Sequence, residues 1–335
     1  MRPPAFWQNP PGHPGLIGRL LQPLGAVYAA TTARRIRHPG YHPKVPVICV
    51  GNLNAGGTGK TPTVIAVIQH LSGMGVDCHI VSRGYGGSLA GPIRVDAQRH
   101  GSEDVGDEPL LLSAFAPTWV AKDRAAGVQA AEAAGAKAII MDDGFQNPSV
   151  MKTLSIIVVD AEKGFGNGLC IPAGPLREPV QNGLLRADLL LSIGPAESQD
   201  RFRQVWGKAL SIPHLTAEIV PLQMGMDWKD QTVLAFAGIG HPEKFFATLR
   251  AEGANLVKTV ALDDHQPISD LLLNRLENEA NLLGAQLVTT EKDQIRLPAN
   301  QRHRVLAMVV RLRLNDPAPL YAALNRVMAL SSQKP

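Results

Sequence analysis

Short apolar runs alternate with predicted helices from residue 44 onward. The runs predict strands at 45–50, 77–81, 117–121, 137–142, 154–160 and 188–193. Between them lie predicted helices at 60–73, 107–115 and 124–134, the last an alanine-rich run of good helix formers. Because strands that alternate with helices form β-α-β units, this order predicts a doubly wound, mostly parallel sheet in an α/β domain that spans residues 44–200.

A second alternating series follows after the polar stretch 195–213, which we interpret as the connection between two domains. Strands are predicted near 233–238, 256–260, 285–289 and 304–310, and helices near 242–252, 268–283 and 317–330. The pattern therefore predicts a smaller C-terminal α/β domain over residues 214–330.

The segment 1–43 has a different pattern. Within it, apolar side chains form a helical stripe over residues 16–28, and the basic residues Arg34, Arg35, Arg37 and His38 follow. An amphipathic helix of this kind packs on its own domain or lies on an anionic membrane surface, and periodicity alone leaves both interpretations open.

Composition places this chain of 335 residues, 45% apolar and 19% charged, among globular proteins. Its 33 basic and 29 acidic residues leave a net charge of +4, spread along the chain, which does not indicate nucleic-acid binding. Cys49, Cys78 and Cys170 form no C-x-x-C pair, which argues against disulfides or a thiolate zinc site. Prolines occupy the place of a signal-peptide core, and no apolar run approaches the roughly 18 residues of a spanning helix, so we expect a cytoplasmic chain.

The strongest local signal is a glycine-rich turn between a predicted strand and a predicted helix, which predicts a P-loop NTPase-like fold. Its backbone N–H groups and lysine would hold ATP phosphates, and its threonine would hold Mg²⁺. In G-x-x-x-x-G-K-[ST], the first glycine is here Asn54, a residue type that tolerates positive φ. The predicted nucleotide-binding residues are Asn54, Ala55, Gly56, Gly57, Thr58, Gly59, Lys60 and Thr61.

Acidic pairs at two further positions could hold a metal ion or act as bases. Asp142 and Asp143 end a predicted strand, where a Walker B acid belongs, although two such aspartates alone are more commonly a cap or a turn. Asp107 and Glu108 open a predicted helix, where acids also serve as cap and dipole partners. His265 is either a solvated loop residue or a base oriented by an acid.

Two other P-loop classes fit poorly. Partitioning ATPases of the ParA and MinD type carry a signature lysine where this chain has Ala55, and the nearest match to the guanine-reading motif N-K-x-D has Glu291 at the lysine position. A kinase that uses ATP is therefore favoured, and a nucleotide-dependent switch or partitioning protein is kept as the alternative.

Six ordered motifs together resemble the tetraacyldisaccharide 4'-kinase family, over about residues 5–330. They are Gly51–Pro62, Ser82–Gly86, Gly106–Pro109, Asp142–Gln146, Pro172–Pro179 and Thr289–Asp293. The resemblance implies transfer of the γ-phosphoryl group of ATP to the 4'-hydroxyl of a tetraacylated glucosamine disaccharide 1-phosphate, which yields lipid IVA in lipid A biosynthesis.

The resemblance also implies a role for each matching residue. Lys60 and Thr61 would bind phosphates and Mg²⁺, and the metal would also be held by Glu108, Asp142 and Asp143. Asp107 would accept the proton of the sugar hydroxyl, with His265 as its partner. The residues implied on the acceptor side are Arg83, Tyr85, Arg124, Gln146, Arg177 and Glu178.

Two departures from the family pattern lie beside these residues. Asn147 stands where the family commonly has His, and Gln266 follows His265 where the family has a second His or an aromatic residue.

A tetraacylated acceptor stays in the bilayer, so the resemblance also implies a peripheral enzyme that docks through its N-terminal segment on the cytoplasmic face of the inner membrane. The remaining alternative, a soluble kinase of a small acceptor, predicts that residues 1–37 are dispensable.

Overall fold

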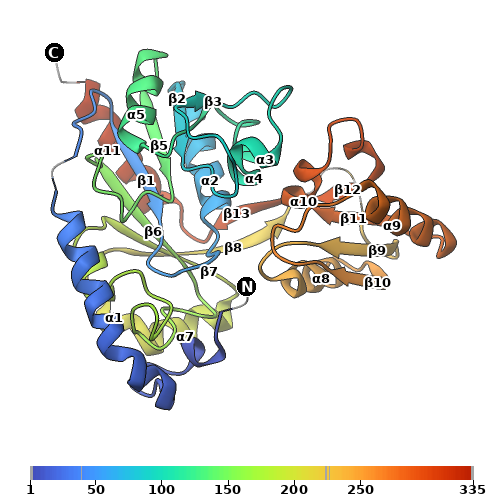
Figure 1. The fold of residues 1–335 in the computed structure, drawn as a ribbon, viewed down its shortest axis with the longest axis horizontal. Helices are drawn as coiled ribbons and strands as arrows, with labels where there is room; N and C mark the ends of the chain where they lie inside the picture. The colour runs from blue at the N-terminus through green and yellow to red at the C-terminus, as the bar shows by residue number, and fades with distance from the viewer. Residues whose placement is uncertain (1–2, 39, 223–224, 226, 333–335) are drawn as a thin grey trace.

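The structure is a computed structural model that describes residues 3–38, 40–222, 225 and 227–332. Parts of the predicted segments 1–43 and 214–330 thus lie outside the described residues. The described chain forms a nine-stranded sheet and a separate four-stranded sheet, each with helices packed against it (Figure 1).

The large sheet is parallel except at its two edges. Its strands are β1 (Val47–Gly51), β2 (Cys78–Ser82), β3 (Ile93–Arg94), β4 (Thr118–Val120), β5 (Ala138–Asp142), β6 (Leu154–Asp160), β7 (Leu189–Ile193), β8 (His214–Pro221) and β13 (Val310–Leu314). They lie in the order β13-β8-β7-β6-β1-β5-β2-β4-β3, with β13 antiparallel to β8 and β3 antiparallel to β4. Strands β1, β2, β5 and β7 are buried along their whole length, as expected for strands covered on both faces.

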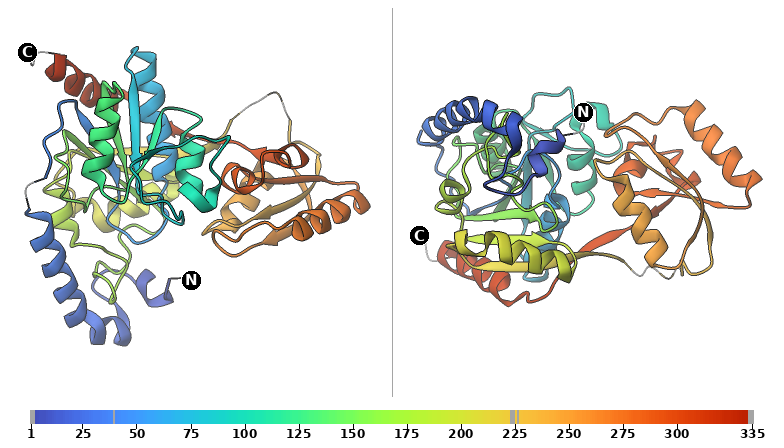
Figure 2. Two further views of the ribbon diagram at one scale, coloured as in Figure 1. Left: turned by 45° about the horizontal axis from the view of Figure 1, so that its top comes forward. Right: turned by 90° about the horizontal axis from the view of Figure 1, so that it is seen from below.

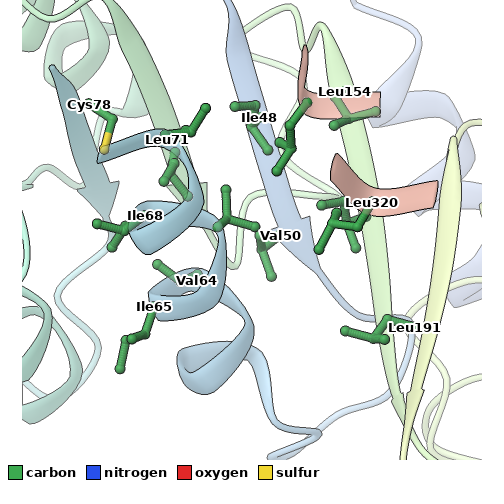
Figure 3. Packing of buried hydrophobic residues seen from close by; sticks show 14 of the residues in the cluster. Ile48, Val50, Val64, Ile65, Ile68, Leu71, Cys78, Leu154, Leu191 and Leu320 are labelled. Atoms are coloured by element: carbon green, nitrogen blue, oxygen red, sulfur yellow. The ribbon is translucent and has the colours of Figure 1, made fainter. Parts of the chain in front are cut away.

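Helices cover both faces of this sheet. On one face α2 (Lys60–Gly73) and α11 (Ala318–Ser332) pack their apolar side chains against β1, β6 and β7 (Figure 3). The other face is covered by α5 (Arg124–Ala133), α6 (Val180–Leu184) and α7 (Ala196–Trp206). The short helices α3 (Ser102–Val105) and α4 (Asp107–Leu112) precede β4.

The small sheet is entirely parallel. Its strands are β9 (Thr232–Ala237), β10 (Asn255–Ala261), β11 (Gln286–Thr290) and β12 (Leu306–Met308), in the order β10-β9-β11-β12. Helix α8 (Pro242–Ala251) packs on one face and α9 (Asp270–Leu282) on the other, each over its own apolar cluster. The short helix α10 (Glu291–Arg296) follows β11 and is turned toward α4 of the large domain (Figure 1).

The division between the domains differs from the predicted one. The polar stretch 195–213 contains α7, which is anchored by the buried ring of Phe202, and β8 then joins the large sheet beside β7. The predicted strand 304–310 is two strands: β12 belongs to the small sheet, and β13 returns to the large sheet ahead of α11. The small domain therefore runs from about β9 to β12 and is an insertion, because the chain after it completes the large domain.

Helix α1 (Gly15–Ile36) is longer than the predicted 16–28 and lies along the large domain, away from the small sheet (Figures 1 and 2). It packs through small residues: a Cβ added at Gly25 would lie 2.7 Å from the carbonyl oxygen of Cys170. Its larger apolar side chains point outward, with exposed fractions of 84% for Leu16 and 77% for Leu20. None of the described helices combines the length and apolarity that crossing a membrane requires.

Candidate active site

The P-loop turns at the carboxyl end of β1 and leads directly into α2. Gly59 precedes the helix with φ +93°, a backbone conformation that favours glycine. Asn52 holds the turn by donating to the carbonyl oxygen of Gly56 at 3.0 Å. Lys60 is the first residue of α2, so its position places the helix N-terminus and its partial positive charge at the loop.

Because asparagine tolerates a positive φ, we expected Asn54 to replace the glycine in a left-handed conformation. Asn54 does not take that conformation. Its side-chain amide instead donates to the carbonyl oxygen of Gly164 at 3.0 Å, and its backbone forms a bridge with Leu176. Asn54 thus fastens the P-loop to the segment that contains the Pro172–Pro179 motif.

Asp143 faces the cations of this site. Its carboxylate accepts from Arg177 at 2.9 and 3.3 Å and lies 3.7 Å from Lys60 Nζ. Burial would raise the pKa of Asp143, but the charges of Lys60 and Arg177 outweigh it and hold the pKa below its usual value.

Asp142 lies in a different environment although it is the adjacent residue. Parallel pairing of β5 with β1 sets it beside Val50, where its side chain is buried. One carboxylate oxygen accepts from Ser82 Oγ at 3.1 Å, and the other, Oδ1, has no hydrogen-bond partner. Burial first, and then the charges of Glu108 and Asp143, raise the pKa of Asp142 to about 7.

Glu108 connects the P-loop to the small domain. Its Oε1 atom accepts from Thr61 Oγ1 at 3.2 Å and from Lys292 Nζ at 2.5 Å. Burial opposes ionisation of Glu108, but Lys292 and Lys60 hold its pKa below the usual value. Among the described residues no three His, Cys, Asp or Glu side chains converge to hold a metal ion by themselves.

Asp107 and His265 meet across the boundary between the two domains. His265 Nδ1 lies 3.1 Å from Asp107 Oδ2. The Asp107 side chain is 5% exposed and the His265 side chain 42% exposed, so the pair opens to solvent on the histidine side. Burial would raise the pKa of Asp107, but His265 and Arg296 overcome it and hold the pKa well below its usual range. The hydrogen bond to Asp107 raises the pKa of His265.

The predicted acceptor-side residues fall into an exposed group and a buried group, apart from the partly buried Arg177 that pairs with Asp143. Arg83 and Tyr85 are exposed, and the Tyr85 ring lies 6.2 Å from the His265 ring. A Cβ at Gly106 would lie 2.6 Å from the carbonyl oxygen of Tyr85, so the Ser82–Gly86 loop packs directly on the turn that carries Asp107.

The buried group consists of Arg124, Gln146 and Glu178. Arg124 is buried and donates to the carbonyl oxygen of Ala121 at 2.8 Å. Glu178 is also buried and accepts from Gln146 at 3.0 Å and from Arg186 at 2.5 Å. Burial and these partners do not favour direct contact of Arg124 or Glu178 with an acceptor, and Glu178 supports Gln146 instead.

Ser82, Lys292 and Arg296 contact predicted site residues but were assigned no role from the sequence, although Ser82 and Lys292 lie within two of the six motifs. Lys292 reaches Glu108, and Arg296 reaches Asp107 with Nη2 at 2.6 Å. The available signal was their spacing, because basic residues four apart lie on one face of a helix. Helix α10 is too short for its periodicity to be recognised in the sequence.

Comparison with known proteins assigns the chain to a family. The family model described as tetraacyldisaccharide-1-P 4'-kinase matches residues 17–329. A tetraacyldisaccharide 4'-kinase from Dinoroseobacter shibae is 59% identical over 336 residues, which cover 100% of both chains. The relative of the same name from Jannaschia sp. is 56% identical and covers 98% of this chain and 99% of its own. The chain belongs to this family.

A solved structure agrees with the fold of this member of the tetraacyldisaccharide 4'-kinase family. It is LpxK from Aquifex aeolicus, described as an "apo" form in complex with ATP, with a TM-score of 0.77 and 24% sequence identity. The match covers 93% of this chain and 100% of that chain. The predicted family, the predicted α/β fold with its mostly parallel sheet, and the prediction of a kinase in lipid A biosynthesis are thus confirmed.

Proposed function

We propose that the chain transfers the γ-phosphoryl group of ATP to the 4'-hydroxyl of tetraacyldisaccharide 1-phosphate, with Asp107 as the base and Mg²⁺ as cofactor. The observation that carries this proposal is the meeting of Asp107 and His265 beside the P-loop corner formed by Thr61 and Glu108. A carboxylate next to a phosphate-binding loop is what attack by a hydroxyl on a phosphoryl group requires.

The P-loop supplies the phosphate site. Backbone N–H groups of residues 56–61 and the α2 N-terminus would surround the phosphates, whereas the N–H of Ala55 donates to the carbonyl oxygen of Pro175 at 2.7 Å. The Lys60 ammonium would neutralise charge that develops on the phosphates. Asp143 and Arg177 would keep Lys60 in place, because the carboxylate of Asp143 lies between the two cations. The Aquifex aeolicus relative was solved in complex with ATP, which supports ATP as the nucleotide of this site.

Thr61, Glu108 and Asp142 fit a divalent cation. The buried, unpartnered Oδ1 of Asp142 and the Thr61 hydroxyl are hard oxygen donors, and Mg²⁺ is commonly held by one or two carboxylates together with substrate phosphates and water. When bound, the ion would neutralise charge on the transferred phosphoryl group. Asp143 would not be a ligand, because Arg177 donates to both of its carboxylate oxygens, whereas Lys292 and Thr61 contact only Oε1 of Glu108 within the described residues.

Replacing Asp142 by Asn tests this metal site. We expect the Mg²⁺ concentration that gives half-maximal activity to rise about tenfold or more, because a neutral amide replaces the unpartnered carboxylate oxygen. Binding of Mn²⁺ to the enzyme with ADP, followed by electron paramagnetic resonance, should weaken in parallel. The control is Asp200→Asn, which neutralises an exposed acid on α7. An unchanged Mg²⁺ requirement in Asp142→Asn would refute the assignment.

Asp107 would act on the acceptor. As the 4'-oxygen forms its bond to the γ-phosphorus, the bond from that phosphorus to the bridging oxygen of ADP breaks, and the hydroxyl proton passes to the Asp107 carboxylate. His265 holds Asp107 Oδ2 and keeps the carboxylate ionised. We propose that the exposed Arg83 and Tyr85 contact the acceptor, since the Tyr85 ring lies 6.2 Å from the His265 ring and Arg83 belongs to the same loop.

Helix α1 would dock the enzyme on the inner-membrane surface. It packs on the protein through Gly18 and Gly25 and leaves its large aliphatic side chains outside, and the exposed Arg34, Arg35 and Arg37 follow at its end. An exposed apolar face beside cationic side chains is suited to the interface of an anionic membrane. This arrangement supports a peripheral enzyme at the cytoplasmic face, where its acylated acceptor would lie.

Two substitutions on α1 test the docking surface. Leu20→Glu together with Leu24→Glu should lower binding to vesicles of phosphatidylethanolamine and phosphatidylglycerol about tenfold or more, because burying one leucine is worth roughly 1.5–3 kcal/mol. The matched control is Leu271→Glu with Leu282→Glu, which changes two leucines on α9 that are more exposed than those on α1. Cosedimentation measures both. Equal binding by the two double variants would show that α1 does not dock.

A further inference from the structure

Arg296 of the small domain reaches the carboxylate that we assign as the base in the large domain. Its Nε and Nη2 atoms lie 3.2 and 2.6 Å from Asp107 Oδ2. Both side chains are only 5% exposed. Two nitrogen atoms of the guanidinium thus contact one carboxylate oxygen, and this buried contact joins α10 to the first turn of α4.

The position of Arg296 is fixed from behind. Its Nη1 atom donates to Asp293 Oδ1 at 2.7 Å and to the carbonyl oxygen of Gly238 at 2.8 Å. Asp293 is completely buried and in turn accepts from the backbone N–H of Gly238 at 3.0 Å and from Thr290 Oγ1 at 2.6 Å. These bonds join α10 to the ends of β9 and β11, so the guanidinium is held rigidly by the small sheet.

The same backbone also holds His265. Its N–H donates to the carbonyl oxygen of Gly238 at 2.9 Å, and its φ of +59° lies in the left-handed region, which is uncommon for histidine. The carbonyl oxygen of Gly238 therefore accepts from both residues that contact Asp107 Oδ2. One rigid part of the small domain presents both of these donors.

The contacts leave the two oxygens of Asp107 in different states. Oδ2 contacts Arg296 and His265, whereas Oδ1 accepts a hydrogen bond from the backbone N–H of Glu108 at 3.1 Å within the described chain. A carboxylate oxygen has two lone pairs, so Oδ1 retains capacity for one further donor. A hydroxyl that approaches Asp107 can therefore be accepted at Oδ1.

We infer that Arg296 is a positioning residue that fixes the Asp107 carboxylate by its Oδ2 atom and thereby turns Oδ1 toward the acceptor hydroxyl. This inference rests on the proposed role of Asp107 as the base. Because Arg296 comes from α10, the base is correctly oriented only when the small domain is docked on α4. Docking of the small domain thus completes the catalytic site.

Kinetics of three variants test the inference. Arg296→Ala should lower kcat about 100-fold and leave KM for ATP nearly unchanged, because a small displacement of a catalytic group has an effect of this order. Arg296→Lys keeps the charge and should lose less. Added guanidinium ion should restore part of the activity of Arg296→Ala, which a general loss of structure would not permit. The control is Arg304→Ala, which removes an arginine of the same domain that pairs with Glu277.

A crystal structure of Arg296→Ala reports the position of Asp107 independently of any activity. We expect its carboxylate to rotate away from the wild-type position or to occupy two positions. A carboxylate that stays in place, or a kcat that neither falls beyond the Arg304→Ala control nor responds to guanidinium, would overturn the inference. If wild-type enzyme phosphorylated no lipid, the proposed function would fail, whereas the crystal structure would still decide the positioning role.

Discussion

Replacing Asp107 by Asn should lower kcat by about 10³-fold or more, because removal of a general base costs 10²–10⁴-fold and the amide also loses the charge that faces Arg296 and His265. ATP binding should be retained, since Asp107 makes no contact with the P-loop lysine in the described structure. Single-turnover phosphoryl transfer and nucleotide binding by calorimetry measure the two effects separately.

The control for Asp107 is Glu103→Gln, which neutralises an exposed acid on the neighbouring helix α3. Because Asp107→Asn removes one of the two buried acids that pair with Arg296, thermal unfolding should accompany the kinetics, and the comparison should be made below the unfolding transition. A folded Asp107→Asn variant that kept kcat within a factor of about ten of wild type would exclude Asp107 as the base.

Replacing Lys60 by Met should lower kcat by about 10³-fold and also weaken ATP binding, because the ammonium would contact the phosphates both before and during transfer. The variant also removes a neighbour of Asp143, whose carboxylate keeps its contact with Arg177. Steady-state kinetics with varied ATP gives kcat and KM. Lys122→Met is the matched control, since Lys122 is an exposed lysine of the same domain.

Loss of ATP affinity without a fall in kcat would assign Lys60 to binding alone and would contradict a role in stabilising the transferred phosphoryl group. The expected result is a fall in both quantities. The same fall in Lys122→Met would show instead that lowering the positive charge of the domain is sufficient.

The nucleotide half of the site was predictable because it depends on local order in the sequence. A strand, a glycine-rich turn and a helix place Lys60 and Thr61, and parallel pairing of two apolar strands brings Asp142 to the same edge of the sheet. These relations need only the chain's own hydrophobic pattern and the geometry of a parallel sheet.

The other half depends on how two domains dock, which no periodicity encodes. Lys292 and Arg296 reach Glu108 and Asp107 only because α10 faces α4, and the resemblance alone paired His265 with Asp107. The boundary near residue 200 was wrong because α7, which looks polar, is held by Phe202, and because β8 and β13 are paired by the large sheet.

The stripe on α1 was predicted correctly as helical, but its periodicity did not indicate which face is buried. In the structure the buried face carries small residues, because Gly18 and Gly25 allow the helix to lie close to the segment around Cys170 and Ala173. The large apolar side chains are therefore on the outer face, where a simple amphipathic pattern would place polar ones.

Transfer of label from γ-labelled ATP to tetraacyldisaccharide 1-phosphate in mixed micelles with Mg²⁺ tests the central claim most directly. The account predicts that wild-type enzyme forms labelled lipid together with an equal amount of ADP, and that Asp107→Asn and Lys60→Met form almost none. Intact ATP binding without labelled lipid would contradict it and would favour a nucleotide-dependent switch over a lipid kinase.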